Sequence, residues 1–217
     1  VVYRPFYGIH ESPIDSNDPN VIFLGSLNLA THVIKSTKWK IWCDVDKFNC
    51  SYYYNYLGEY LLNSNYIFLS LKEAIRQKEM IFDLFGDDCF FIRPDNGYKS
   101  FKGNVINCNN FEKEMNQLTN EDSSLNQLCV ITSPKNIDAE YRFFIIDGNP
   151  VTASQYHLNN RLNIAPDAPK EIWDYATKIA KIWQPESAYV LDIGKIKDKI
   201  GVVEINSPTA QPAPRTD

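Results

Sequence analysis

The sequence predicts a protein of mixed α and β structure, α+β or α/β in class, on three observations. The chain has 217 residues, enough for one large domain or two small ones. Hydrophobic residues make up 44% of it and aromatic residues 13%, which excludes wholesale disorder. Segments with the two-residue alternation of strands occur beside segments with apolar residues at helical spacing.

The first 65 residues are expected to form a small α/β lobe. Its strands are expected at 21–24 and 39–43 and its helices at 27–35 and 51–63. The second of these helices is rich in tyrosine, with Ser51 as its N-cap. Aromatic residues in this stretch would suit stacking on single-stranded nucleic acid, but their helical spacing favours packing in a core.

Two further lobes are expected at 66–128 and 129–217. In the first, Ser70 and Glu73 form a capping box for a helix over 70–84 that ends at Gly86. The other elements of this lobe are strands 66–69, 89–93 and 103–107 and a helix 110–118. The last lobe is expected to contain strand 127–132, hairpin strands 140–146 and 151–156 around Asp147-Gly148, helix 169–183, hairpin strands 189–196 and 200–206, and a proline-rich tail.

Charge and cysteine usage limit the partners. The chain has 22 basic and 27 acidic residues, a net charge of −5, which disfavours duplex nucleic acid but leaves room for a local basic cleft. Its five cysteines, among them Cys89 and Cys129 in apolar runs, indicate reduced core thiols in a cytoplasmic protein. No membrane partner is expected, because no apolar run reaches 18 residues. Since the chain begins at Val1 instead of Met, we expect residues upstream of it.

The last hairpin contains the strongest candidate site. With a three-residue loop at 197–199, facing residues have numbers that sum to 396, so Asp192 faces Glu204, Gly194 faces Val202 and Ile196 faces Ile200. Asn206 shares the face of Glu204. Two carboxylates side by side repel each other unless a cation lies between them, and three oxygen ligands suit Mg²⁺. The alternative is a solvated polar face, with the acids neutralised by Lys195, Lys197 and Lys199.

Two further segments carry charge in places that need a partner. In FFIRPDNGYKSFKG, a strand ends at Arg93 and a loop with Lys99 follows, an arrangement that can hold an anion or can be a surface turn. In EYRFFIIDG, Glu140 and Arg142 lie on one face of an apolar strand. Arg142 could face a transferring phosphate, or the two charges could pair with each other.

Taken in order, these segments resemble the ATP-grasp family, including a subfamily common in phages and bacteria. The resemblance rests on GSLNLA, YLLN, FIRPDNGYKSFKG, the AEYR strand and VVEIN, and covers about 21–207. It implies two α+β subdomains that clasp Mg-ATP, preceded by the small lobe. It also implies a ligase that activates a carboxylate as an acyl-phosphate, which an amine or thiol then attacks. The carboxylate would belong to a small molecule, an amino acid, a peptide or a protein.

The resemblance also implies roles for particular residues. The metal ligands would be Asp192, Glu204 and Asn206. Arg93, which stands where many family members have Lys, would hold phosphates with Lys99, while Arg142 would face the γ-phosphate. The remaining contacts are expected from Val130, Ile131, Thr132 and Ser133 through backbone groups to adenine, from Lys135 and Glu140 to the nucleotide, and from Ser154 and Arg161 to the substrate.

Two other functions fit the same scaffold. One is a non-catalytic nucleotide-binding module, or a phage module that interacts with a host protein in the host cytoplasm. The other is a ligase that modifies a nucleic acid such as tRNA. Retention of ATP without turnover would identify a binding module.

Overall fold

The computed structural model describes residues 45–208, apart from 86–87, 98–99, 120–124 and 159–160. The elements expected at 21–24, 27–35 and 39–43, the helix end at Gly86 and nearly all of the tail lie outside the described residues. What is described has two antiparallel sheets with helices against each, so the α+β class is confirmed.

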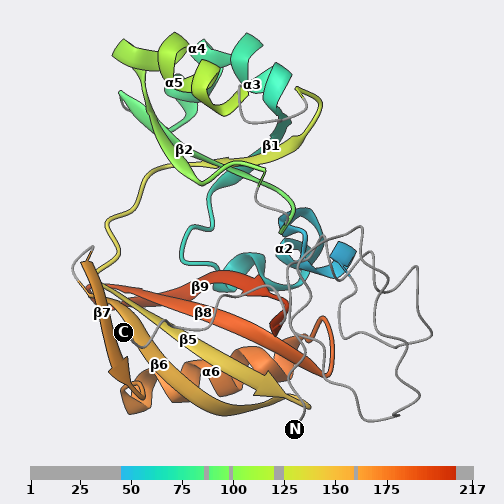
Figure 1. The fold of residues 1–217 in the computed structure, drawn as a ribbon, viewed down its shortest axis with the longest axis vertical. Helices are drawn as coiled ribbons and strands as arrows, with labels where there is room; N and C mark the ends of the chain where they lie inside the picture. Colours follow the sequence, from blue (N-terminus) through green and yellow to red (C-terminus); the bar gives the residue numbers. More distant parts are fainter. Residues whose placement is uncertain (1–44, 86–87, 98–99, 120–124, 159–160, 209–217) are drawn as a thin grey trace, which may run out of the picture.

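The first sheet has four antiparallel strands in the order β1-β4-β2-β3. Its helices lie together on one side, at the upper end of Figure 1. Between sheet and helices is a core that includes Ile92, Ile131 and Met115. The elements are β1 (Tyr66–Ser70), α3 (Leu71–Arg76), α4 (Lys78–Phe85), β2 (Cys89–Pro94), β3 (Asn104–Asn107), α5 (Phe111–Thr119) and β4 (Leu128–Thr132).

The second sheet has five antiparallel strands in the order β7-β6-β5-β8-β9. Helix α6 (Lys170–Ile182) packs on one face, where it meets odd-numbered residues of β5 such as Phe143 and Ile145. The even-numbered residues of β5 therefore lie on the other face, toward the first sheet. The strands are β5 (Ala139–Ile146), β6 (Asn149–Leu158), β7 (Arg161–Pro166), β8 (Ala188–Ile196) and β9 (Lys199–Asn206).

Helix α2 (Cys50–Leu57) lies where the two sheets approach each other (Figure 1). Its Tyr53 and Leu57 are buried in the core of the second sheet. Its first turn is held by the first sheet, because Asp95, just after β2, accepts hydrogen bonds from the Ser51 backbone N at 2.6 Å and Oγ at 2.9 Å. A carboxylate at a helix N-terminus satisfies backbone donors that the helix leaves unpaired.

The chain after α2 runs along the outer edge of β9. The backbone N of Leu62 donates to the Val202 carbonyl at 2.9 Å. The approach is so close that a Cβ on Gly201 would lie 2.4 Å from Leu62 Cα. This edge of the sheet is therefore covered by backbone, and a side chain at position 201 has no space.

Several predicted elements differ from the observed ones. The helix expected over 51–63 ends at Leu57 and continues only as a 3-10 turn, Gly58–Tyr60, and Asn49 is its N-cap in place of Ser51. The helix expected over 70–84 breaks at Gln77 into α3 and α4, although Ser70 caps it as predicted, accepting from the Glu73 N at 3.2 Å. Strand β7 was not predicted, because RLNIAP has neither clear alternation nor a turn signal before it.

The last hairpin pairs as predicted at the site but not at the turn. The loop has two residues, Lys197 and Asp198, so Ile196 pairs with Lys199 and Gly194 with Gly201. A register shift between Asp192 and Ile193 inserts one extra residue in β9 and restores the pairing of Asp192 with Glu204. The predicted pairs of Gly194 and Ile196 are therefore wrong, and the pair that defines the site is right.

The four described cysteines are all free. Cys50 and Cys129 are buried as core thiols, but Cys89 is half-buried and Cys108 is exposed, so the expectation of core thiols is wrong for Cys108. No helix in the described part of the chain is both long enough and apolar enough to span a membrane.

The divisions predicted at 65 and 128 remain predictions. Residues 128–132 form β4, which pairs with β1 and β2 in the first sheet, and the second sheet begins at Ala139. The change from one sheet to the other therefore falls between Thr132 and Ala139.

Candidate functional site

A row of charged side chains crosses three adjacent strands of the second sheet. Arg142 on β5 pairs with Asp192 on β8, and Asp192 pairs with Glu204 on β9. Ser154 on β6 continues the row on the other side of Arg142. These residues lie on the face that α6 leaves uncovered, because the alternate residues of the same strands form the core with α6.

Arg142 and Asp192 form a two-point ion pair. Arg142 Nε donates to Asp192 Oδ1 and its Nη2 donates to Oδ2, each at 2.8 Å. The Asp192 side chain is 1% exposed. Burial raises the pKa of Asp192 to about 6, although Arg142 opposes the shift. The predicted pair of Arg142 with Glu140 does not form, since Glu140 binds His157.

Glu204 is held by an arginine from the other sheet. Arg93, on β2 of the first sheet, donates to Glu204 Oε1 on β9 of the second. Both side chains are largely buried, 19% and 16% exposed. The lysines that could have neutralised the acids are engaged elsewhere: Lys195 with Glu171, and Lys199 with the Leu62 carbonyl. The two arginines and two acids thus form one charged cluster between the sheets.

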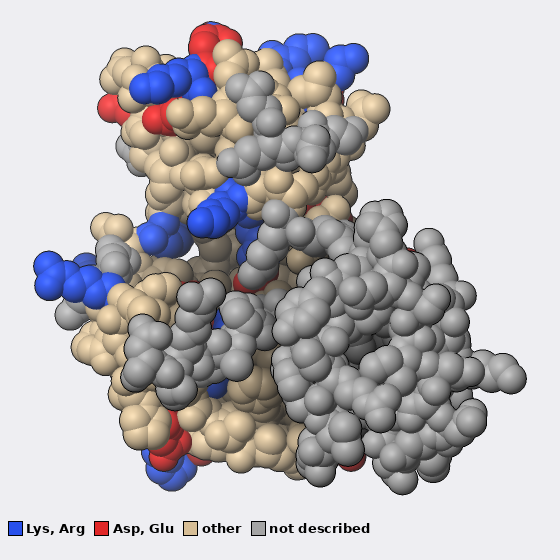
Figure 2. Space-filling view, viewed as in Figure 1, with Lys and Arg blue, Asp and Glu red and all other residues tan. Residues whose placement is uncertain are grey.

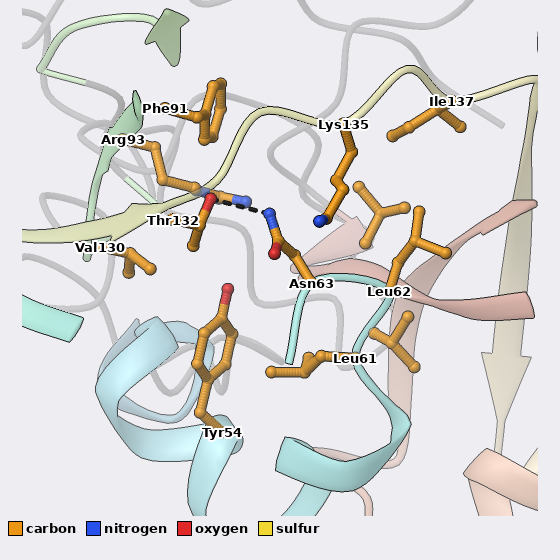
Figure 3. Close-up of a pocket in the computed structure, with 12 residues that line it drawn as sticks. Tyr54, Leu61, Leu62, Asn63, Phe91, Arg93, Val130, Thr132, Lys135 and Ile137 are labelled. Atoms are coloured by element: carbon orange, nitrogen blue, oxygen red, sulfur yellow. Dashed lines mark hydrogen bonds between the residues drawn. The ribbon is translucent and has the colours of Figure 1, made fainter. Parts of the chain in front are cut away.

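A cavity of about 150 Å³ lies beside this cluster, between the two sheets. Figure 2 shows basic side chains at the narrowing between the two lobes. In Figure 3, Tyr54, Asn63 and Lys135 reach into the same space from three separate segments. Asn63 Nδ2 donates to Thr132 Oγ1 and to the Ser133 carbonyl, both at 2.8 Å. The cavity is lined by Tyr54, Leu61, Leu62, Asn63, Phe91, Arg93, Val130, Thr132, Lys135, Ile137, Val202 and Val203.

The segment expected to meet adenine is only partly available. Val130 and Thr132 line the cavity, whereas the Ile131 side chain is fully buried in the core on the other face of the sheet. Strand β4 pairs on both sides, so the ladder uses the backbone groups of Val130 and Ile131. Backbone donors and acceptors for a planar ligand therefore begin at the end of β4, near Ser133.

A second cavity of about 230 Å³ adjoins the first along the connection between the sheets. It is lined by Lys135, Ile137, Glu140 and His157, and it shares Lys135 and Ile137 with the first. His157 Nδ1 and Glu140 Oε2 are 3.1 Å apart. Predicted nucleotide residues Lys135 and Glu140 thus line adjoining spaces.

Two predicted residues are not brought to the row. Lys99 lies outside the described residues. Arg161 is exposed at the start of β7 and pairs with Leu158, which faces Ala139, three residues before Arg142. In contrast, Asn63, Tyr54 and Tyr156 were missed by sequence reasoning. Asn63 follows the apolar pair Leu61-Leu62, and a lone polar residue there was the one available signal.

The donor set fits a hard divalent ion in chemistry. Asp192 and Glu204 offer carboxylate oxygens, and Asn206 lies two residues beyond Glu204 on the same face. Asn206 Nδ2 is buried and unpaired, so an amide turned to present its oxygen to the cluster would lose no hydrogen bond at that nitrogen. No group of three His, Cys, Asp or Glu residues that could hold a metal occurs among the described residues, so two acids and one amide are the whole set there.

Comparisons with known proteins identify the family. A family model described as an ATP-grasp domain, the second family of its clade, matches residues 75–215, more than half of the chain. The chain therefore belongs to this family of the ATP-grasp superfamily, and the ATP-grasp fold predicted from the sequence is confirmed. A search of curated proteins finds no match.

Solved structures share the fold at low identity. The ATP-grasp ligase PsnB with a minimal precursor matches at a TM-score of 0.50 and 15% identity, over 76% of this chain and 53% of that one. D-cycloserine synthetase DcsG gives 0.51 and 13%, over 75% and 63%. D-alanine–D-alanine ligase from Bacillus anthracis gives 0.54 and 15%, over 76% and 58%. The match thus spans little more than half of these proteins' own length.

Proposed function

We propose that the protein is an ATP-dependent ligase that joins a carboxylate to an amine through an acyl-phosphate. The observation that carries this proposal is the cluster of Arg93, Arg142, Asp192 and Glu204 between the sheets, next to a cavity. Two acids and two arginines match the needs of phosphoryl transfer, where positioning and charge neutralisation supply most of the catalysis. The named ligases that share the fold support the same class of reaction.

The nucleotide would occupy the space between the sheets. The apolar and tyrosine-lined cavity suits the base, with acceptors and donors near Ser133, and Lys135 and Glu140 lie alongside. Arg93 would hold phosphate oxygens with Lys99, and Arg142 would hold the transferring phosphate. A planar guanidinium can make two parallel hydrogen bonds to a phosphate, as it does to Asp192 here.

Mg²⁺ held by Asp192, Glu204 and Asn206 would neutralise phosphate charge. The chain's own contribution is to exchange partners: each acid is now bound to an arginine, and both arginines become available to phosphates when the acids bind a cation. The substrate carboxylate, of an amino acid or peptide, would attack the γ-phosphate near Ser154. The amine would then attack the acyl carbon and phosphate would leave.

The competing function is a non-catalytic nucleotide-binding module, and one observation favours it. Both acids are already satisfied by arginines, so the cluster is stable as a purely structural network. Such a protein would bind ATP and release neither ADP nor phosphate.

ADP release separates the two functions. The protein is incubated with Mg-ATP and a mixture of the common amino acids, D-alanine and a peptide pool rich in Asp and Glu. We expect release that depends on the mixture and is abolished by Glu204→Gln. The matched control is Glu171→Gln, which removes a surface carboxylate paired with Lys195 and should keep full activity. Binding of ATP with no release under any condition would contradict a ligase.

A further inference from the structure

Strands β5 and β6 are out of regular register beside the charged row. Glu140 pairs with His157, but the next residue, Tyr141, pairs with Gln155, so Tyr156 has no partner in the ladder. In a regular strand, consecutive side chains lie on opposite faces, whereas a bulge can place two of them on the same side. Here Tyr156 contacts Arg142 and His157 contacts Glu140, two residues of β5 that share one face.

The bulge gives Arg142 a second support. The centre of its guanidinium, Cζ, lies 4.9 Å from the centroid of the Tyr156 ring. This distance is within the range of a cation–π interaction, which strengthens as water is removed. Asp192 binds the same guanidinium through Nε and Nη2. Arg142 is therefore held by a carboxylate in its plane and by an aromatic ring.

These two supports respond differently to a bound ligand. If Asp192 becomes a metal ligand, its oxygens are shared with the cation and its hold on Arg142 weakens. The Tyr156 ring has no such second role, so it would go on holding Arg142 when the nucleotide is bound. We propose that Tyr156 is a positioning residue that keeps Arg142 directed at the transferring phosphate, an inference that rests on the proposed function.

The contact needs the ring and not the hydroxyl. Burial, followed by the carboxylates of Asp192 and Glu140, raises the pKa of Tyr156 above its ordinary value, so the side chain stays a neutral phenol. Phenylalanine also presents an aromatic face to a cation, so Tyr156→Phe should preserve the support. Leucine and methionine have comparable apolar character without a ring, so Tyr156→Leu and Tyr156→Met should remove it.

The first measurement is ADP release from Mg-ATP in the amino-acid and peptide mixture. We expect Tyr156→Leu to lower kcat by about tenfold with little change in the KM for ATP, and Tyr156→Phe to stay within about twofold of wild type. The matched control is Phe144→Leu, which removes another partly exposed aromatic ring from the same face of β5. It should leave kcat unchanged. Thermal melts establish that each variant folds, and Tyr156→Met replaces the leucine variant if that one does not.

The second measurement is binding, without turnover. Calorimetry gives the affinities for Mg-ADP and for the Mg complex of a non-hydrolysable ATP analogue. If the ring directs Arg142 at the γ-phosphate, Tyr156→Leu lowers affinity for the analogue and leaves that for ADP, whereas a merely structural role would lower both equally. Equal losses for both nucleotides, or equal losses in the Phe and Leu variants, would overturn the inference while wild-type turnover upholds the ligase. No nucleotide binding by wild type would overturn both.

Discussion

Replacing Arg142 with methionine tests whether the buried acid at the centre of the row depends on its arginine. Asp192 is 1% exposed and receives two hydrogen bonds of 2.8 Å from this one side chain. Removing one partner of a buried ion pair costs about 3–5 kcal/mol, because the remaining charge has neither partner nor water. Arg142 is itself 22% exposed, so we expect the low end, about 3 kcal/mol at pH 7.5.

The second acid substitution makes the test specific. Asp192→Asn alone leaves a partly exposed arginine that water can reach, and should cost about 1 kcal/mol. In the double variant no unpaired charge remains, so its total cost should be about 2 kcal/mol, against about 4 kcal/mol if the effects were additive. The assay is urea unfolding followed by circular dichroism, in EDTA. An additive double variant would refute the view that the two side chains act as one buried pair.

Three further predictions concern the backbone, the pH dependence and the reaction. Gly201→Ala should destabilise the protein by about 2 kcal/mol in the same unfolding assay, because its Cβ would meet the backbone of Leu62, while Gly58→Ala, with 3.5 Å of space, should cost nothing. A folded pKa of about 6 for Asp192, against 3.8 ordinarily, means that the folded state holds its proton longer than the unfolded state as pH rises. Relative to Asp192→Asn, the wild-type free energy of unfolding should therefore fall by about 3 kcal/mol between pH 4 and pH 6 and change little above; a flat difference would contradict the burial argument. Arg142→Met should reduce kcat by about a hundredfold and the affinity for Mg-ADP by less than threefold, measured by ADP release and calorimetry, and equal losses would mean uniform binding.

Periodicity and turn chemistry predicted most strands and helices correctly. Asp147 and Gly148 both adopt positive φ, at 48° and 72°, in the tight turn predicted from this dipeptide. Helix α6 spans nearly the residues expected from its apolar stripe. The helix predicted to Asn63 ended early, because Leu61 and Leu62 gain more from pairing with the edge of β9 than from another helical turn.

The acid pair of the site could be predicted because it depends on a hairpin. Asp192 and Glu204 are near each other in sequence, and one turn fixes their register apart from the extra residue. Arg93 is 111 residues from Glu204, so their contact follows from how the two sheets meet, which local patterns do not encode. The bulge at Tyr156 was also out of reach, because QYHL alternates no differently from a regular strand.

The most direct test of the account is a crystal structure with Mg²⁺ and a non-hydrolysable ATP analogue. The account predicts a cation bound by the carboxylates of Asp192 and Glu204, with Arg93 and Arg142 released from them and bound to phosphate oxygens. A nucleotide bound elsewhere, with both arginine–carboxylate pairs intact and no cation between the acids, would contradict it.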